Sequence, residues 1–329
     1  MTPAQDRTDE LVDRIVALIL DELTPQIRML VGHKWPDTDV WMCLWMAKKF
    51  VSKASAAEIT FVNAGETLPE SENDPSVLHF DTGGGQYDQH GKNLKRTSSA
   101  TLLAERLEIQ GDPGLKALLS LTIAVDNVEE ISPTNLHYVI EGLPRIHRGA
   151  DNQPDWNAVQ KTVFDMFDIV YGQEIGRQRS RDDLKKFAGF YTLPNGLRFT
   201  KLLWQARLRE AAFEQGADVV LWTDRKNGGF YVGVQVNRRS RVTLSGVAAS
   251  LRKAEAAARG TVPQGDLTFV GQEETNWFLH DSRKLILCGS RTHELTKDEF
   301  TKLTVQQICQ KVGETLETVR WNVVIANRR

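Results

Sequence analysis

Cysteine is scarce in this chain of 329 residues, and its three copies lie far apart. Cys43, Cys288 and Cys309 form no Cys-x-x-Cys pair, which argues against a disulfide framework and against a cysteine-based structural zinc site. Free cysteines are typical of reducing compartments, so we expect a cytoplasmic protein. The polar, acidic first residues, TPAQDRTDE, are also unlike a secretory signal peptide.

Long apolar runs are lacking as well. The longest strongly apolar run, 15–20, is far too short to span a bilayer, so we expect no membrane partner. Hydrophobic residues make up 41% and charged residues 26% of the chain, which is ordinary for a soluble globular protein.

A strong net charge is the third absence, because the formal charge is only −2. The two signs are nevertheless unevenly distributed. Residues 1–180 carry 17 Lys or Arg against 27 Asp or Glu, and residues 181–260 carry 15 against 7. An acidic first part suits cations and a basic second part suits phosphates, although an uneven solvated surface explains the same numbers equally well.

The length exceeds what one hydrophobic core usually holds, so two domains are expected. We predict a metal-binding catalytic domain over 1–180 and an α+β substrate-binding domain over 181–329. In the first domain, apolar strands alternate with helical patterns, which is typical of a doubly wound, mainly parallel sheet in an α/β fold. Ligands bind at the carboxyl ends of the strands in such sheets. The helix after the first strand carries Trp41 and Trp45 at helical spacing, and we expect both in the core rather than as base-stacking platforms.

The apolar patterns and turn signals predict the following elements. In the first domain they are helix 8–23, strand 27–31, helix 38–51, strands 58–63 and 76–81, a helix opening at Ser98, helix 115–128 and a helical tract from Trp156. A charged linker, 176–186, is expected next. The second domain is expected to contain a hairpin over 187–200, helix 202–215, strands 218–223 and 230–237, helix 245–259, strands near 277–280 and 285–288, a helix near 305–316 and a last strand, 321–326.

The stretch VGHKWPDTDV, 31–40, is the first candidate site. Pro36 disfavours helical geometry at the residue before it, so His33, Asp37 and Asp39 are predicted on an irregular turn where side chains can converge. One imidazole and two carboxylates suit Mn²⁺ or Mg²⁺. The alternative is structural, because Asp37 or Thr38 can cap the following helix. This stretch alone leaves both interpretations open.

Further candidate ligands follow later in the chain. Asp81 ends the third expected strand, and Gly83, Gly84 and Gly85 come directly after it. Consecutive glycines permit positive φ and can form an anion-binding nest of amides, or only a flexible turn. Asp88 and His90 return a carboxylate and an imidazole to the same edge. Asp126 lies among apolar residues, where a metal or a nearby Arg is needed to offset the cost of burial.

Taken together, these motifs resemble the aspartate–histidine–histidine (DHH) phosphoesterase superfamily. The family's H-x-x-x-D-x-D motif is matched by His33, Asp37 and Asp39, its second motif by Asp81 and its fourth by Asp126. Its third motif, normally D-H-H, appears as Asp88-Gln89-His90. The segments GGGQYDQH and IAVDN are similar to the MYG-type exonuclease branch. The resemblance covers roughly residues 26–130, and the family's C-terminal GGGH signature is missing.

The resemblance implies two Mn²⁺ or Mg²⁺ ions with Asp81 bridging them. His33, Asp37 and Asp81 would hold the first ion, and Asp39, Asp81 and Asp126 the second. Gln89 replaces a ligating histidine, which weakens the second position because an amide oxygen binds Mn²⁺ less strongly than imidazole does. His90 would face the substrate phosphate. The other candidate residues are Asp88, Lys34 and Lys92 for catalysis, and Gly83, Gly84, Gly85, Arg238, Arg239 and Arg241 for substrate binding.

The leading hypothesis is therefore a metal-dependent phosphoesterase acting on a nucleotide, a short oligonucleotide or a cyclic dinucleotide. Two ions would activate a water for in-line attack on phosphorus. The alternative is a catalytically weakened nucleotide- or nucleic-acid-binding protein with a one-metal site, because Gln89 departs from the motif. A third interpretation, an interaction scaffold, rests on the charge asymmetry alone. A homodimer is left open as the assembly.

Overall fold

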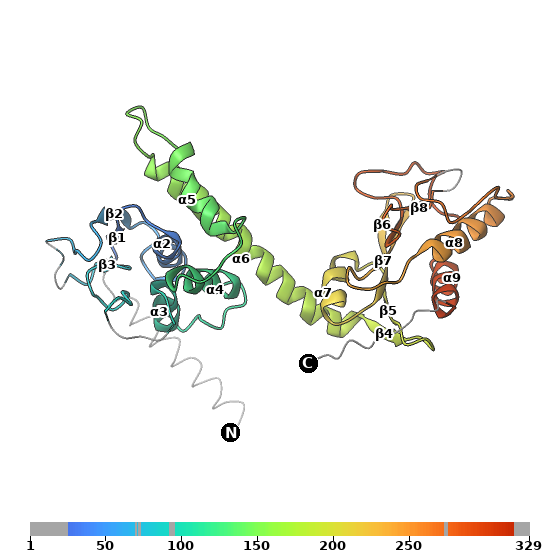
Figure 1. Ribbon diagram of the computed structural model, residues 1–329, viewed down its shortest axis with the longest axis horizontal. Coiled ribbons are helices and arrows are strands. Elements are labelled where there is room, and N and C mark those ends of the chain that lie inside the picture. The colour runs from blue at the N-terminus through green and yellow to red at the C-terminus, as the bar shows by residue number, and fades with distance from the viewer. Residues whose placement is uncertain (1–25, 70, 72–73, 92–95, 273–275, 319–329) are drawn as a thin grey trace, which may run out of the picture. The chain divides into compact units, whose positions relative to one another are not determined.

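The computed structural model describes residues 26–69, 71, 74–91, 96–272 and 276–318 (Figure 1). The chain divides into two compact units, 1–176 and 177–329, and each is described by itself. The helix expected over 8–23 and the strand expected over 321–326 lie outside the described residues.

The first unit is built on a parallel sheet of three strands: β1 (Met29–His33), β2 (Glu58–Val62) and β3 (Val77–His79). Their order is β2-β1-β3, and both neighbours pair with β1 in parallel, with Gly32 opposite Phe61 and Leu30 opposite Leu78. The predicted parallel pairing is confirmed. β1 begins two residues later than expected and includes His33, so this candidate ligand is the last residue of a strand.

Helix α2 (Thr38–Phe50) packs against this sheet and is buried over Thr38–Ala47. Its sequence has almost no polar face, as expected of a helix that is covered on all sides. Trp41 is 1% exposed and Trp45 2%, which confirms both as core residues. Around α2 lie α3 (Ser99–Arg106), α4 (Lys116–Asp126) and α5 (Leu136–Ile146); α5 had not been foreseen.

The two faces of the sheet are packed differently. Leu30, Ile59 and Leu78 join the core that α2 shares, whereas Val31 and Val62 belong to a small separate cluster on the other face. A doubly wound sheet needs helices on both faces, and the described residues supply helices to the α2 face. The mixed α/β class with a parallel sheet is therefore confirmed, while the doubly wound arrangement stays a prediction.

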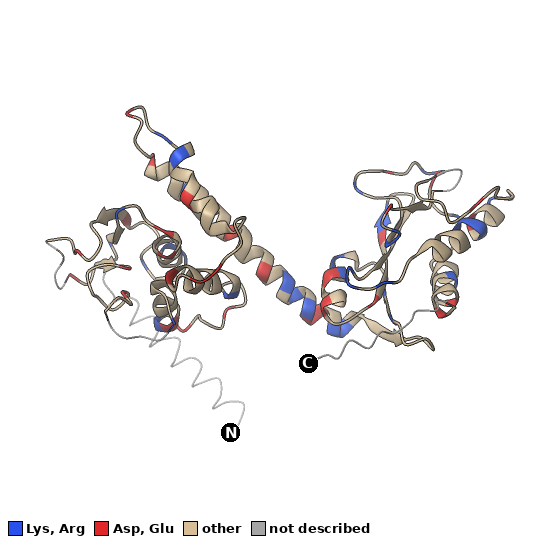
Figure 2. Ribbon diagram, viewed as in Figure 1, with Lys and Arg blue, Asp and Glu red and all other residues tan. Residues whose placement is uncertain are grey.

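The predicted linker over 176–186 is helical, because these residues continue helix α6 (Trp156–Phe187), and the division between the two units falls at its start, after Gly176. Figure 2 shows the dense Lys and Arg positions along the C-terminal part of this helix. Opposite charges recur there at helical spacing, as in the ion pair of 3.3 Å between Lys185 Nζ and Asp182 Oδ1. Such pairs three or four residues apart support a solvated helix, so a charged composition did not mean an irregular segment.

The second unit combines a six-stranded sheet with helices, consistent with the α+β class. Its strands are β4 (Gly189–Thr192), β5 (Arg198–Leu202), β6 (Val219–Lys226), β7 (Gly229–Val236), β8 (Phe278–Leu279) and β9 (Leu285–Cys288), in the order β4-β5-β6-β7-β9-β8. Its other elements are the 3₁₀ turn η1 (Ala206–Leu208) and the helices α7 (Arg209–Glu214), α8 (Ser245–Ala258) and α9 (Val305–Glu317).

Most boundaries of this unit match the predicted elements, including the hairpin of β4 and β5. The helix expected over 202–215 is shorter, because Leu202 is buried as the last residue of β5 and the helical turns start only at Ala206. β5 also pairs in parallel with β6, which was not foreseen. None of the described helices is long and apolar enough to cross a membrane.

Candidate metal centre

The predicted ligands converge at the carboxyl ends of β1 and β3 and at the end of α4. Most of them line a cavity of about 460 Å³. Its wall consists of His33, Asp37, Ala64, Gly65, Asp81, Asp88, His90, Val125 and Asp126. Residues from four separate stretches of sequence thus meet at one edge of the sheet, as expected for a parallel α/β sheet.

His33 and Asp81 form a close charged contact in this acidic cavity, with 3.2 Å between Nε2 and Oδ2. The other ring nitrogen, Nδ1, lies 2.9 Å from the Lys34 carbonyl oxygen. A carbonyl only accepts, so Nδ1 carries a hydrogen and Nε2 is the atom aimed at the cavity. A histidine fixed in this way by a backbone carbonyl is typical of metal ligands.

The contact between His33 and Asp81 shifts the pKa values of both side chains. The hydrogen bond to Asp81 raises the pKa of His33 to about 9, against the effect of burial. Burial opposes the charge of Asp81, but the hydrogen bond and the charge of His33 outweigh it and leave the pKa of Asp81 lowered. At neutral pH the pair is therefore an imidazolium and a carboxylate, with a proton in the place that a cation would take.

Asp37 confirms the structural alternative. It is the N-cap of α2, and its Oδ1 accepts hydrogen bonds from the amides of Asp39 (2.9 Å) and Val40 (3.0 Å). The cap engages one carboxylate oxygen, so Oδ2 remains to serve an ion, and the two roles are compatible. Burial raises the pKa of Asp37. The turn before it is irregular, as expected, with Trp35 in the left-handed region at φ 54°.

Asp39 is fully buried and is held by a second helix. Its two oxygens accept from the amides of Ser99 (2.7 Å) and Ala100 (3.1 Å), which open α3. A helix N-terminus favours a carboxylate through these free amides and the helix dipole. Burial nevertheless raises the pKa of Asp39 well above its ordinary range, and the charges of Asp126 and Asp81 add to this effect.

Asp126, at the C-terminal end of α4, accepts a hydrogen bond of 2.7 Å from Gln89 Nε2. The sequence predicts a metal or an arginine to offset the cost of its burial, whereas the structure gives it a neutral amide as hydrogen-bond partner. Burial raises the pKa of Asp126 to about 7, with the charge of Asp81 as the next cause.

Gln89 is oriented differently from the prediction. Its Nε2 donates to Asp81 Oδ1 (3.0 Å) as well as to Asp126, while its Oε1 accepts from the Ser99 hydroxyl. The oxygen expected to bind a metal therefore faces Ser99, and the amide nitrogen bridges two carboxylates. The reason is electrostatic, because two neighbouring carboxylates attract a donor and repel an acceptor.

Three groups of side chains among the described residues have ligand atoms within 4.8 Å of one another: His33, Asp37 and Asp81; Asp39, Asp81 and Asp126; and Asp81, Asp88 and His90. The first two are the sets implied by the resemblance. The first fits a divalent ion, since it offers an oriented imidazole and two carboxylates. The second does not fit as arranged, because the Gln89 amide lies between Asp81 and Asp126 and both oxygens of Asp39 bind amides.

The glycine loop adopts the conformation expected but binds an internal partner. Gly83 and Gly84 have φ of 73° and 66°, which only glycine adopts readily. The amide of Gly84 donates to Asp88 Oδ2 at 2.8 Å, so an Asp88 carboxylate is bound where a substrate anion was expected. His90 reaches the cavity, with its Nε2 3.1 Å from Asp81 Oδ1.

Several predicted residues lie elsewhere. Lys34 donates to Asn63 Oδ1 at 3.0 Å and lines a neighbouring cavity instead of the acidic one. Lys92 lies outside the described residues. Arg238, Arg239 and Arg241 lie on the loop after β7, in the second unit.

The second unit contains a basic, aromatic cavity of about 650 Å³ that no sequence motif predicts. Arg207, Arg209 and Arg291 line it together with Trp204 and Trp222. The guanidinium carbon of Arg209 lies 4.9 Å from the centre of the Trp222 ring. Its basic residues come from separate segments rather than one run, so a search for charge runs did not find them. Ser99, which orients Gln89, was also missed.

Comparison with protein-family models and with curated proteins finds no match for this chain. Solved structures do match. One is the pGpG-specific phosphodiesterase PggH from Vibrio cholerae, with 11% identity and a TM-score of 0.31, covering 70% of this chain and 88% of that one. Another is the DHH domain of a member of a family of ribosomal proteins, with 9% identity and a TM-score of 0.33, covering 98% and 93%.

A third is an exopolyphosphatase-related protein from Bacteroides fragilis, with 8% identity and a TM-score of 0.25, covering 92% of this chain and 96% of that one. Scores this low do not establish a shared fold, and the low identities say nothing about substrate.

The raised pKa values predict how stability depends on pH when no divalent ion is present. The pKa of Asp126 is raised from 3.8 to about 7, so the folded chain holds this proton more tightly than the unfolded chain. Its contribution to the free energy of unfolding is then lost as pH rises from about 4 through 7. We expect Asp126→Asn to make the decline between pH 5 and 7 shallower, measured by urea unfolding in EDTA.

The exposed Asp165 offers a matched control, and Asp165→Asn should leave the slope unchanged. His33, whose pKa is raised from 6.5 to about 9, contributes its own loss of stability between those values and should do so in both variants. Parallel slopes for Asp126→Asn and the unsubstituted protein between pH 5 and 7 would contradict the prediction.

Proposed function

We propose that this protein is a metal-dependent phosphoesterase that hydrolyses a phosphate ester of a nucleotide, short oligonucleotide or cyclic dinucleotide. The observation that carries the proposal is the convergence of His33, Asp37 and Asp81 on one cavity, with Asp126 and His90 beside them. Buried carboxylates without matching cationic side chains are costly. A divalent cation offsets that cost, and phosphate esters are a common substrate of such sites.

Each side chain has a role in this proposal. His33, Asp37 and Asp81 would hold Mn²⁺ or Mg²⁺, which supplies Lewis-acid chemistry toward a phosphoryl oxygen. Asp126, whose pKa is about 7 when no ion is bound, lies on the cavity wall, where its carboxyl can take or give a proton. His90 is exposed at the mouth of the cavity, where its imidazole can donate a hydrogen bond to a phosphate oxygen. Asp88 holds the glycine loop through the Gly84 amide.

The second candidate function is nucleotide binding without turnover, and Gln89 favours it. Its amide nitrogen bonds to both Asp81 and Asp126, which fills the position of a second ion. A site limited to one ion lacks the symmetric clamp on attacking and leaving oxygens that two-metal phosphoesterases use. Calorimetry with a 5′-phosphorylated dinucleotide and Mn²⁺, beside a turnover assay, separates the candidates. Binding without product would favour the binding protein.

Asp81 should be the most sensitive position, because every candidate ligand group among the described residues includes it. We expect Asp81→Asn to lower Mn²⁺-stimulated hydrolysis of bis-p-nitrophenyl phosphate by at least about 100-fold. Changes outside the ligand set already cost roughly 10- to 100-fold, and this change removes a ligand. The Asp165→Asn variant, on the exposed face of α6, should retain activity. Full activity of Asp81→Asn would refute the metal-dependent mechanism.

Gln89 should limit the number of ions bound. We expect one Mn²⁺ per chain in the unsubstituted protein and two in Gln89→His, because imidazole supplies a lone pair where the amide supplies a hydrogen. Native mass spectrometry counts the ions, and electron paramagnetic resonance reports coupling between two neighbouring Mn²⁺ ions. The exposed Gln86 gives the control, since Gln86→His places a histidine three residues away, outside the cavity wall. Two ions in the unsubstituted protein would show that Gln89 moves aside.

A further inference from the structure

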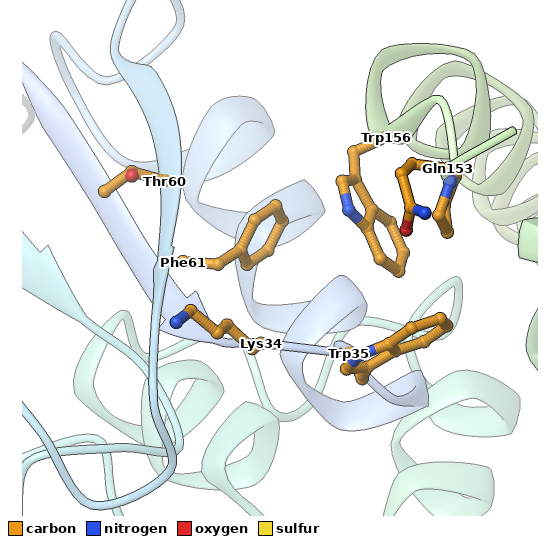
Figure 3. A pocket seen from close by; sticks show the side chains of 7 residues that line it. Lys34, Trp35, Thr60, Phe61, Gln153 and Trp156 are labelled. Atoms are coloured by element: carbon orange, nitrogen blue, oxygen red, sulfur yellow. The ribbon is translucent and has the colours of Figure 1, made fainter. Parts of the chain in front are cut away.

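A second cavity of the first unit, of about 400 Å³, has aromatic walls, and its first lining residue, Lys34, directly follows His33 of the acidic cavity. Figure 3 shows the rings of Trp35, Phe61 and Trp156 turned toward the same space, with Gln153 beside Trp156. Its volume lies within the range of roughly 300–1,000 Å³ that is typical of small-ligand pockets. We call it the aromatic pocket.

Two of its rings are fixed by the core beneath them. Phe61 and Trp156 each pack against the buried Trp41, with ring centres 5.7 and 6.4 Å apart respectively. Their own ring centres are 6.0 Å apart. These walls are therefore set by the same core that positions α2, and they offer a preformed apolar surface.

Trp35 is the exception, because it is 66% exposed. Its ring centre lies 5.4 Å from that of Trp156, at 85° between the planes, so it forms an outer wall instead of filling the core. Its φ of 54° is unfavourable for a bulky residue. Backbone strain of this kind is concentrated at functional sites, and here it directs a large, exposed aromatic ring toward the aromatic pocket.

The chain connects the two cavities directly. His33 lines the acidic cavity, and the next two residues, Lys34 and Trp35, line the aromatic pocket. The amide of Lys34 donates to the Val62 carbonyl and its ammonium to Asn63 Oδ1, and the next residues of that loop, 64–65, line the acidic cavity. In Figure 3 the Lys34 ammonium points away from the three rings. The Lys34 ammonium is therefore held by Asn63, and the apolar rings lie on its other side.

We propose that the aromatic pocket binds the nucleobase of a nucleotide whose phosphate lies in the acidic cavity. A planar heteroaromatic ring uses both the apolar faces and the polar edge offered by Gln153, and base stacking on aromatic side chains tolerates any base. This inference rests on the proposed function, and it narrows the substrate class to nucleotidyl esters, excluding inorganic polyphosphates.

The test is equilibrium binding of two ligands that differ only in the base. AMP and ribose 5-phosphate are titrated by calorimetry into the full chain with Mn²⁺, and each mixture is checked for released phosphate, so that binding is compared only where no turnover occurs. Trp35→Ala should weaken AMP binding by about 5- to 150-fold, the range expected for losing one stacking partner, and leave ribose 5-phosphate binding unchanged. Trp35→Phe should restore most of the AMP affinity. Tyr138→Ala, an exposed aromatic residue outside both cavities, is the matched control and should behave as the unsubstituted protein.

Equal effects of Trp35→Ala on both ligands, or an unsubstituted protein that binds AMP no better than ribose 5-phosphate, would overturn the proposal. Hydrolysis of bis-p-nitrophenyl phosphate, measured separately with Mn²⁺, keeps the two proposals apart. Base-dependent binding without hydrolysis would leave the aromatic pocket standing and refute the phosphoesterase. Hydrolysis without base-dependent binding would support the phosphoesterase and refute base binding in the aromatic pocket.

Discussion

The gathering of carboxylates around Asp81 is the constraint on which this part of the structure depends. Asp39, Asp81 and Asp126 offer oxygens within 4.8 Å of one another, and at such distances like charges raise the cost of ionisation. Several devices offset this cost. His33 contributes a proton, Gln89 contributes amide hydrogens to Asp81 and Asp126, and a helix N-terminus holds Asp39. A cation in the first ligand set would replace the His33 proton without disturbing the others.

The fold makes this gathering possible because two helices begin beside the ends of two strands. Asp37 caps α2 shortly after β1, and Asp39, near the start of α2, binds the first amides of α3. Asp37 therefore both stabilises a helix end and is a candidate to hold an ion. Removing the carboxylate of Asp37 or Asp39 would perturb folding together with the acidic cavity. Asp126 and Gln89 cap no helix, so substitutions at these two residues better separate an effect on the cavity from an effect on folding.

The sequence predicted the convergence of His33 and Asp81 well, because strand ends in a parallel sheet share an edge whatever the details of packing. Asp126 lies at the end of helix α4 instead, and its place beside them was implied by the resemblance. The direction in which a side chain points beyond its Cβ was much harder to predict from the sequence. Gln89 was expected to offer its oxygen, and Lys34 to face the acidic cavity, and both depend on neighbours far apart in sequence. Ser99 takes the Gln89 oxygen and Asn63 takes the Lys34 ammonium. The helix over 176–186 was missed for another reason, since its charges pair along the helix and carry no apolar stripe.

The charge of the acidic cavity at neutral pH bears on how an anionic substrate could enter. Fully ionised carboxylates would repel a phosphate, but the pKa of Asp126 is raised to about 7 and that of Asp39 is raised well above its ordinary range. Before an ion binds, a proton held on Asp126 and the imidazolium of His33 reduce the negative charge that a phosphate meets. If only one cation binds, the attraction between the acidic cavity and a phosphate remains weak, because the neutral Gln89 amide takes the position of a second cation. Binding energy from an uncharged part of the substrate then matters more, and stacking in the aromatic pocket adjoining His33 is a source of that energy which neither pH nor metal occupancy removes.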